Sequence, residues 1–177
     1  HVRFGLAAVK NVGEKAVESI VAARTAGGPF VSLHDFCERV DLRLVNKSVI
    51  ENLIQCGAFD CLGGKRAQYA AILNAAMEVG ASVHHDRASG QVNLFDGPDS
   101  GGASPENLPD IEEWPESQRL TYERKILGLY VTSHPLATHE RILSKFSTST
   151  IAKLAGLSDG VDVVVGERFL LTIHRGP

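Results

Sequence analysis

The chain has 177 residues, of which 44% are hydrophobic, and a formal net charge of -3 at pH 7. This length and composition are typical of a globular protein with one full core, or of one domain and part of another. The sequence has no run of about 18 apolar residues and no secretory signal pattern at its start, so we expect a cytoplasmic protein without membrane contact. The small net charge excludes a generally basic nucleic-acid-binding protein.

Charge is distributed unevenly along the chain. Residues 1–66 contain nine basic and seven acidic residues, whereas residues 86–116 contain eight acidic residues and one basic residue. A surface that binds phosphates through backbone amides needs few cations. The first region is therefore compatible with DNA binding, and the acidic region is not.

The cysteines and histidines predict neither a metal site nor a disulfide. Cys37, Cys56 and Cys61 are odd in number and lie in apolar helical contexts, and the last two are spaced too widely for a zinc-binding pair. His84 and His85 lie in a polar stretch, where we expect solvation. We expect no metal and no cofactor, because no convincing pair of carboxylates lies in an apolar context that would hold magnesium.

The first part of the chain predicts two helices joined by a tight turn. Apolar residues recur at helical spacing up to Val9 and again from Val17, so residues 10–14 form the turn. Gly13 tolerates the positive φ that such a turn demands, and Asn11 is one of the few other residue types that adopt it readily. Unpaired amides at the N-terminus of the second helix, helped by its dipole, would then bind a phosphate oxygen.

This turn resembles the helix-hairpin-helix motif, in which a small apolar residue lies between two glycines. Asn11-Val12-Gly13 fits that pattern except that asparagine replaces the first glycine. Short glycine turns also join helices that bind no ligand, so the motif alone leaves DNA contact and a plain helical corner equally open. The residues expected to contact DNA here are Lys10, Asn11, Val12, Gly13, Glu14 and Lys15.

The following residues predict a second, looser unit of the same kind. The expected helices cover residues 14–26, 33–40, 47–55 and 65–79, and Ser32 and Asn46 are expected N-caps. Packed together, the two units would form a tandem helix-hairpin-helix domain over residues 1–79. The second turn is expected to contact DNA through Gly57, Gly63, Gly64, Lys65 and Arg66. Solvated surface cations are an equally good interpretation of the last two.

Residues 80–113 have the Gly, Ser, Asp and Pro content of a flexible acidic linker. Within it, Leu94 and Phe95 form an apolar pair in polar surroundings, and such pairs usually have a partner. The segment resembles the Gln-x-x-Leu-Phe pentapeptide with which bacterial replication proteins bind the sliding clamp. By that resemblance the clamp-binding residues are Gln91, Val92, Asn93, Leu94 and Phe95. The alternative is that the pair packs on the chain's own helices.

Beyond the linker, residues 114–157 predict a helix up to Gly128 and a helical connector. His134 precedes Pro135 in a turn, which favours a structural hydrogen bond over a catalytic role. Residues 160–166 and 168–174 predict two strands, and an isolated hairpin is only marginally stable. We therefore expect residues 158–177 to begin an incomplete β domain, in a fold that is mainly α-helical.

Several segments have the order and spacing of a single family. They are residues 4–14, 30–36, 45–47, 56–60, 91–95 and 127–136. Together they resemble an internal segment of the bacterial replicative DNA polymerase III alpha subunits, closely over residues 2–136 and loosely to about 165. The resemblance implies non-sequence-specific contact with duplex DNA, binding to the sliding clamp, and processivity in DNA replication, with the rest of the polymerase chain as a further partner.

By the same resemblance the segment is not an enzyme on its own, because the polymerising carboxylates of that family lie in a palm that is absent here. A helical scaffold that binds only proteins through the acidic linker is the main alternative. A DNA glycosylase or lyase would use Lys10 or Lys15 as its nucleophile. No carboxylate accompanies either lysine in an evident pocket, which disfavours that class.

Overall fold

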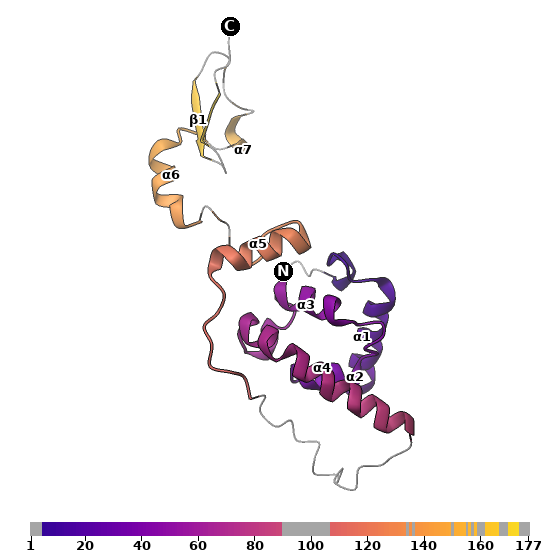
Figure 1. The fold of residues 1–177 in the computed structure, drawn as a ribbon. Coiled ribbons are helices and arrows are strands. Elements are labelled where there is room, and N and C mark those ends of the chain that lie inside the picture. The colour runs from indigo at the N-terminus through magenta and orange to yellow at the C-terminus, as the bar shows by residue number, and fades with distance from the viewer. Residues whose placement is uncertain are drawn as a thin grey trace. The chain divides into compact units, whose positions relative to one another are not determined.

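The computed structural model describes residues 5–89, 107–133, 135, 137–149, 151–154, 156, 158, 162–166 and 170–173. It is mainly helical, as predicted, and divides into two compact units, residues 1–130 and 131–177 (Figure 1). The first unit contains the 3-10 turns η1 (Leu6–Ala8) and η2 (Asp60–Leu62), and the helices α1 (Glu14–Gly27), α2 (Leu33–Arg39), α3 (Lys47–Gln55), α4 (Arg66–Ser89) and α5 (Glu116–Leu127).

The second unit combines short helices with a β-hairpin. Its elements are η3 (Ala137–His139), α6 (Glu140–Phe146), α7 (Ile151–Leu154), β1 (Val163–Gly166) and β2 (Leu170–Ile173). The strands pair antiparallel, with Val163 opposite Ile173. The main-chain amide of Thr148 donates to the carbonyl of Val164 at 2.8 Å, and Val164 donates back to the Thr148 hydroxyl at 2.9 Å. The two predicted strands are therefore present, and Thr148, between α6 and α7, adds hydrogen bonds to β1.

Local capping explains where two of the helices begin. The Ser32 hydroxyl accepts a hydrogen bond from the Asp35 amide at 2.9 Å, and the Asn46 side chain accepts one from the Val49 amide at 3.1 Å. Both predicted N-caps are confirmed. The carboxylate of Asp35 accepts a hydrogen bond from the amide of Val31 at 3.0 Å, which fixes the residue before the N-cap Ser32.

Helix α4 is longer than the sequence predicts. The composition of residues 80–89 predicts a linker, but these residues continue the helix to Ser89, and His84 and His85 lie on it. Gly80 does not end the helix. A Cβ at this position would lie 2.6 Å from the carbonyl oxygen of Cys37 on α2. Glycine is therefore needed for the close approach of two helix backbones, a requirement that local composition does not reveal.

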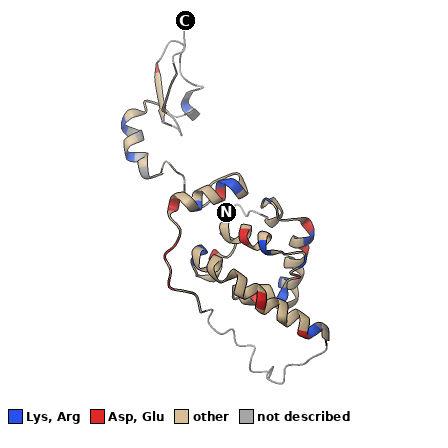
Figure 2. Ribbon diagram, in the orientation of Figure 1, with Lys and Arg blue, Asp and Glu red and all other residues tan. Residues whose placement is uncertain are grey.

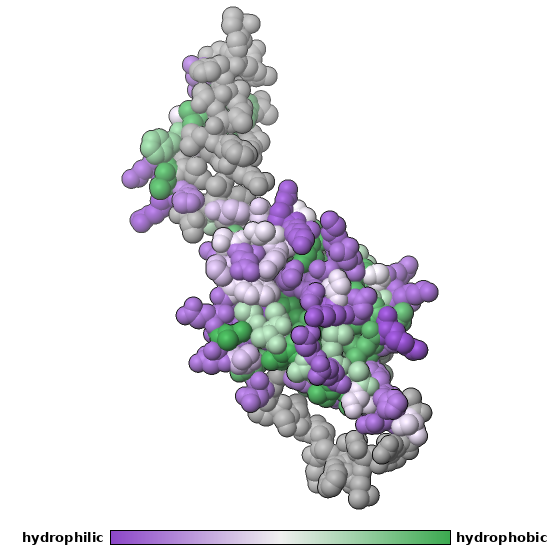
Figure 3. All heavy atoms as spheres, in the orientation of Figure 1, coloured by the Kyte–Doolittle hydropathy of each residue, from purple (hydrophilic) through white to green (hydrophobic). Residues whose placement is uncertain are grey.

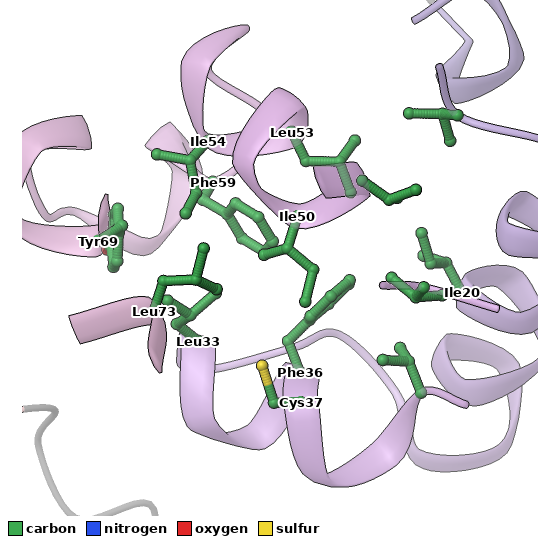
Figure 4. Close-up of a cluster of buried hydrophobic side chains, with 14 of the residues drawn as sticks. Ile20, Leu33, Phe36, Cys37, Ile50, Leu53, Ile54, Phe59, Tyr69 and Leu73 are labelled. Carbon is green, nitrogen blue, oxygen red and sulfur yellow. The ribbon is translucent and has the colours of Figure 1, made fainter. Parts of the chain in front are cut away.

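The helices α1 to α5 of the first unit pack around one hydrophobic core. Figure 4 shows Phe36, Ile50 and Phe59 directed toward one another from α2, α3 and the turn after α3. The rings of Phe36 and Phe59 meet edge to face with centroids 5.0 Å apart. Val12 and Ile126 belong to the same buried cluster. The first turn and α5 are thus built into one core with the helices between them.

Hydrophilic residues cover much of the first unit on the face drawn in Figure 3, with apolar patches between them.

Among the described residues, no helix combines the length and the apolar character needed to cross a membrane. The same part of the chain contains no cluster of three or more His, Cys, Asp or Glu side chains suited to a metal ion. Cys37 is buried, Cys56 half-buried and Cys61 exposed, all as free thiols.

Candidate nucleic-acid interface

The first hairpin, residues 9–13, connects η1 to α1. Val9 and Val12 are buried, whereas Lys10, Asn11 and Gly13 are exposed. The amide of Val12 donates to the carbonyl of Val9 at 3.1 Å and closes the turn. The two valines therefore fix the turn on the core, and the residues between and after them face the solvent.

The conformation of this turn differs from the prediction at one glycine. Asn11 has φ 64° and is the one non-glycine residue with positive φ in the described part of the chain. Gly13 has φ -71° and ψ 156°, an extended conformation open to any residue, so the prediction that Gly13 supplies the positive φ is wrong. Its role is space. A Cβ on Gly13 would meet no heavy atom within 4 Å, which leaves the position open to an approaching ligand.

Backbone amides gather at this exposed turn. Across the described residues, the amides of Asn11, Gly13, Glu14 and Lys15 have no hydrogen-bond acceptor, and the N-cap glycine supplies no side-chain acceptor to α1. The first bond of the helix runs from the Ala16 amide to the Gly13 carbonyl at 3.0 Å. The positive end of the helix dipole lies at the same place. Free donors and this dipole together form an arrangement that binds anions, and phosphates in particular.

Two other helices hold the hairpin in position. The amide of Lys10 donates to the carbonyl of Ile126 in the last turn of α5 at 3.1 Å. The side-chain amide of Asn52 on α3 donates to the carbonyl of Lys10 at 3.3 Å. Because both polar groups of the Lys10 backbone are engaged, the turn is oriented before any ligand arrives.

The charge at the hairpin is modest. Lys10, Glu14 and Lys15 are all exposed, and no ion pair joins any of them to another described residue. Figure 2 shows basic and acidic residues interspersed over the first unit instead of a uniformly basic face. A phosphate at this position would therefore be bound mainly by backbone amides, with the two lysines adding long-range attraction.

The second turn uses its amides within the protein. The amide of Gly57 donates to the Ile54 carbonyl at 3.0 Å, that of Gly63 to the Asp60 carbonyl at 3.3 Å, and that of Gly64 to the Tyr69 hydroxyl at 2.9 Å. Gly57 and Gly63 have φ of 83° and 85°, so both are required by the path of the chain. These three predicted contact residues shape the turn and present no open amide donor.

The side chain of Arg66 is used inside the protein, and its predicted contact with DNA stays a prediction. Its side chain forms ion pairs with Asp60 at 2.7 Å and with Glu123 at 2.9 Å, and the residue is only 4% exposed. Burial by itself lowers the pKa of Arg66, but the hydrogen bonds and charges of the two carboxylates raise it above its ordinary value. The sequence hides this role because Glu123 lies 57 positions further along the chain.

Lys65 remains at the surface, but it is engaged. Its ammonium donates to the carbonyl of Ile111 at 2.9 Å, and its amide donates to the Gln68 side chain at 2.9 Å. The backbone amides of all five residues predicted for the second turn therefore have acceptors among the described residues.

The N-terminus of α4 already binds an anion, the carboxylate of Glu113. Its two oxygens accept hydrogen bonds from the amides of Arg66 at 2.9 Å, Ala67 at 3.1 Å and Trp114 at 2.8 Å. Burial raises the pKa of Glu113, but these three bonds and the charge of Arg119 outweigh it, so the net pKa lies below its ordinary value. Sequence reasoning missed Glu113, and its only sequence signal is an acid ahead of a predicted helix.

Two predicted features lie outside the described residues. They are the clamp-binding segment, residues 91–95, and His134. Their roles stay predictions from the sequence.

Comparison with known families and proteins agrees with the geometry of the first hairpin. Residues 1–69 match the family described as helix-hairpin-helix motif. The DNA polymerase III subunit alpha of Saccharopolyspora erythraea is 41% identical over 161 residues, which cover 88% of this chain and 14% of that protein. The proteins of the same name from Vibrio cholerae and Haemophilus influenzae are 40% and 36% identical, and cover 86% and 96% of this chain.

The chain spans 13% to 15% of the length of these three relatives. Its similarity therefore concerns one segment of a much longer protein. Within that segment, the helix-hairpin-helix match includes the first hairpin, whose exposed amides have no acceptor among the described residues. The chain belongs to the family of bacterial DNA polymerase III alpha subunits.

Proposed function

We propose that this chain is the part of a bacterial replicative DNA polymerase that binds duplex DNA and tethers the enzyme to its sliding clamp. The first hairpin supports the proposal best. It presents the amides of Asn11, Gly13, Glu14 and Lys15, which have no acceptor elsewhere in the described residues, at the positive end of α1. The region also matches the helix-hairpin-helix motif, and relatives are named DNA polymerase III subunit alpha.

The hairpin would bind one DNA strand through its phosphate oxygens. Gly13 allows close approach because it has no side chain, and its surroundings are open. Lys10 and Lys15 would add attraction that salt screens. Contacts of this kind carry no base information, so the polymerase could hold the duplex at any sequence.

The tether would be the segment Gln91–Phe95, with Leu94 and Phe95 as apolar anchors and the Gln91 amide at the edge of the clamp pocket. A tether makes each return of the polymerase to DNA an intramolecular step, at an effective concentration on the order of millimolar for a short flexible linker. Processivity would follow. Nucleotide addition would belong to other parts of the whole protein, which would act in the cytoplasm.

A helical scaffold that binds only protein partners is the competing function. It would leave the first hairpin as a plain corner between helices. DNA affinity at low salt separates the two, because a scaffold has no reason to bind a duplex.

The DNA part is tested with a fluorescent duplex titrated at low salt, using the wild-type chain and Gly13→Val. A side chain at Gly13 fits the extended backbone but occupies the approach to the amides, so we expect roughly tenfold weaker binding, as for the loss of one hydrogen-bonded contact. Gly5→Val is the matched control, because Gly5 is also extended, exposed and free of neighbours within 4 Å of a Cβ. Equal affinities for the two variants would contradict the proposed contact.

The clamp part is tested by titrating the chain against a bacterial sliding clamp, alongside the double variant Leu94→Ala/Phe95→Ala. We expect the wild type to bind and the double variant to lose binding, because both anchors are removed. Gly13→Val should retain clamp binding. If the wild type fails to bind the clamp, or the double variant binds equally well, the tether is refuted and the DNA contact stands alone.

A further inference from the structure

The segment that precedes α5 lies across the start of α4. We call residues 108–114 the strap. Besides the Glu113 carboxylate, two backbone carbonyls of the strap accept hydrogen bonds from the start of α4. The Ile111 carbonyl accepts from the Lys65 ammonium at 2.9 Å, and the Pro109 carbonyl accepts from the Gln68 side chain at 2.7 Å. Leu108 packs on the edge of the core beside Gly64.

The pattern of these bonds is one-sided. Four consecutive residues, Lys65 to Gln68, each donate one hydrogen bond to the strap, two through backbone amides and two through side chains. The strap contributes acceptors to every one of these bonds. A nucleic-acid backbone has the same chemistry, because its phosphate oxygens accept hydrogen bonds and donate none.

The charge of the strap matches that chemistry as well. Its charged residues are Asp110, Glu112 and Glu113, with no base among them. Figure 2 shows acidic residues in the extended stretch before α5. We call the turn between α3 and α4, residues 56–65, the second hairpin, and the sequence predicts it to be a looser repeat of the first. The strap contacts it at Gly64 and Lys65. An acidic, acceptor-rich segment therefore covers the N-terminus of α4, whose amides would otherwise be open to an anion.

We propose that the strap is an internal stand-in for the DNA backbone, which occupies the phosphate position of the second hairpin until duplex DNA displaces it. The inference rests on the proposed DNA-binding function of the first hairpin. With the strap bound, only the first hairpin contacts the duplex. With the strap displaced, the amides of Arg66 and Ala67 and the ammonium of Lys65 add a second phosphate contact.

Displacement of the strap would uncover the edge of the core at Leu108 but would keep the contact of Trp114 with α5. Trp114 packs edge to face on Tyr122 of α5, with ring centroids 5.1 Å apart, and so fixes the end of the strap. The side chains of Arg66 and Glu123 form their ion pair, whereas Arg66 donates to Glu113 through its main-chain amide. Displacement therefore breaks the bonds to residues 65–68 and leaves α4 and α5 joined.

The first experiment measures duplex affinity for Glu113→Gln and Glu112→Gln in the full chain. Glu112 is the adjacent exposed acid, so both variants remove the same charge from the same segment. The neutral amide in Glu113→Gln weakens the charge-assisted bonds that compete with DNA, so we expect roughly tenfold tighter binding than for Glu112→Gln. The added phosphate contact should also steepen the dependence of log affinity on log salt by about 0.9.

The second experiment needs no substitution. Trp114 is the single tryptophan of the chain, so its fluorescence reports on the end of the strap. We expect saturating duplex to increase the quenching of Trp114 by acrylamide, because the residues before it detach. Unchanged quenching at saturation would overturn the displacement. Because this experiment uses the wild-type chain, its result does not depend on whether the Glu113→Gln variant folds.

The outcomes separate the two proposals. If the wild type binds through Gly13 but Glu113→Gln and Glu112→Gln bind equally, the strap is only a helix cap and this inference fails alone. If neither the wild type nor Glu113→Gln binds duplex at low salt, both proposals fail. Tighter binding by Glu113→Gln together with increased quenching in the wild type supports the inference.

Discussion

The guanidinium of Arg66 and the carboxylate of Glu123 meet at 2.9 Å inside the first unit, where the two residues are 4% and 0% exposed. The same Arg66 group donates to the carbonyl of Gln55 at 3.3 Å. The end of α3, the start of α4 and the middle of α5 therefore converge on one buried cation. This arrangement places α5 against the first hairpin, where its Ile126 carbonyl accepts from Lys10.

Glu123→Gln should destabilise the chain strongly. The change keeps the size of the side chain but removes the charge of the buried carboxylate that pairs with Arg66. Asp60, which also pairs with Arg66, is half exposed and compensates less. We expect the free energy of unfolding to fall by about 3 kcal/mol, as for other broken buried pairs. Urea unfolding measures it. Glu116→Gln, on an exposed position of the same helix, is the control, and an equal loss in the two variants would show that the buried pair contributes nothing special.

Gly80→Ala should also destabilise, although alanine is the better helix former. A Cβ at Gly80 would lie 2.6 Å from the carbonyl oxygen of Cys37 and 2.8 Å from its carbon, so two helix backbones must separate. We expect a loss of about 2 kcal/mol in unfolding free energy. Ser82→Ala, at an exposed position two residues further along α4, should change stability by less than about 0.5 kcal/mol. A Gly80→Ala variant as stable as wild type would mean that α2 and α4 do not touch at this point.

Features set by neighbouring residues could be predicted from the sequence. Asn46 caps α3 through an amide three positions away, and Gly128 ends α5 with φ 78°. The repeat of apolar residues likewise predicted the helices of the first unit. In each case the interaction lies within one turn of the chain, so the local pattern contains all the information that is needed.

Features set by distant partners could not be predicted. The sequence predicts a helix end at Gly80, because the residue that requires glycine there, Cys37, lies in another helix. It predicts a surface cation at Arg66, because the partner Glu123 lies far along the chain. The first hairpin lies between these cases. Its turn and the left-handed Asn11 follow from local chemistry, whereas its attachment to α5 and to Asn52 appears only in three dimensions.

The pKa of Glu113 makes one contribution to stability depend on pH. In the folded chain this pKa is lower than its ordinary value, so the unfolded chain binds the proton more readily. The carboxylate therefore stabilises the fold above the ordinary glutamate pKa of about 4.3, and this stabilisation is lost as the pH falls through the lower folded value. We expect the difference in unfolding free energy between wild type and Glu113→Gln to be constant from about pH 7 to pH 5 and to shrink below. Urea titrations between about pH 7 and pH 3 measure it, and a difference that persists unchanged to about pH 3 would contradict the hydrogen bonds assigned to Glu113.

Lys15→Gln should reduce the salt dependence of duplex binding. Lys15 lies in the first turn of α1, beside the open amides, and it is exposed. If it neutralises one phosphate, its loss lowers the slope of log affinity against log salt by about 0.9. Arg24→Gln is the matched control because Arg24 is an exposed cation in the last turn of the same helix, roughly 15 Å from the hairpin at 1.5 Å per residue. The two variants change the net charge equally, so a slope reduced to the same extent in both would indicate attraction by overall charge. A reduction confined to Lys15→Gln would place a phosphate at the N-terminus of α1.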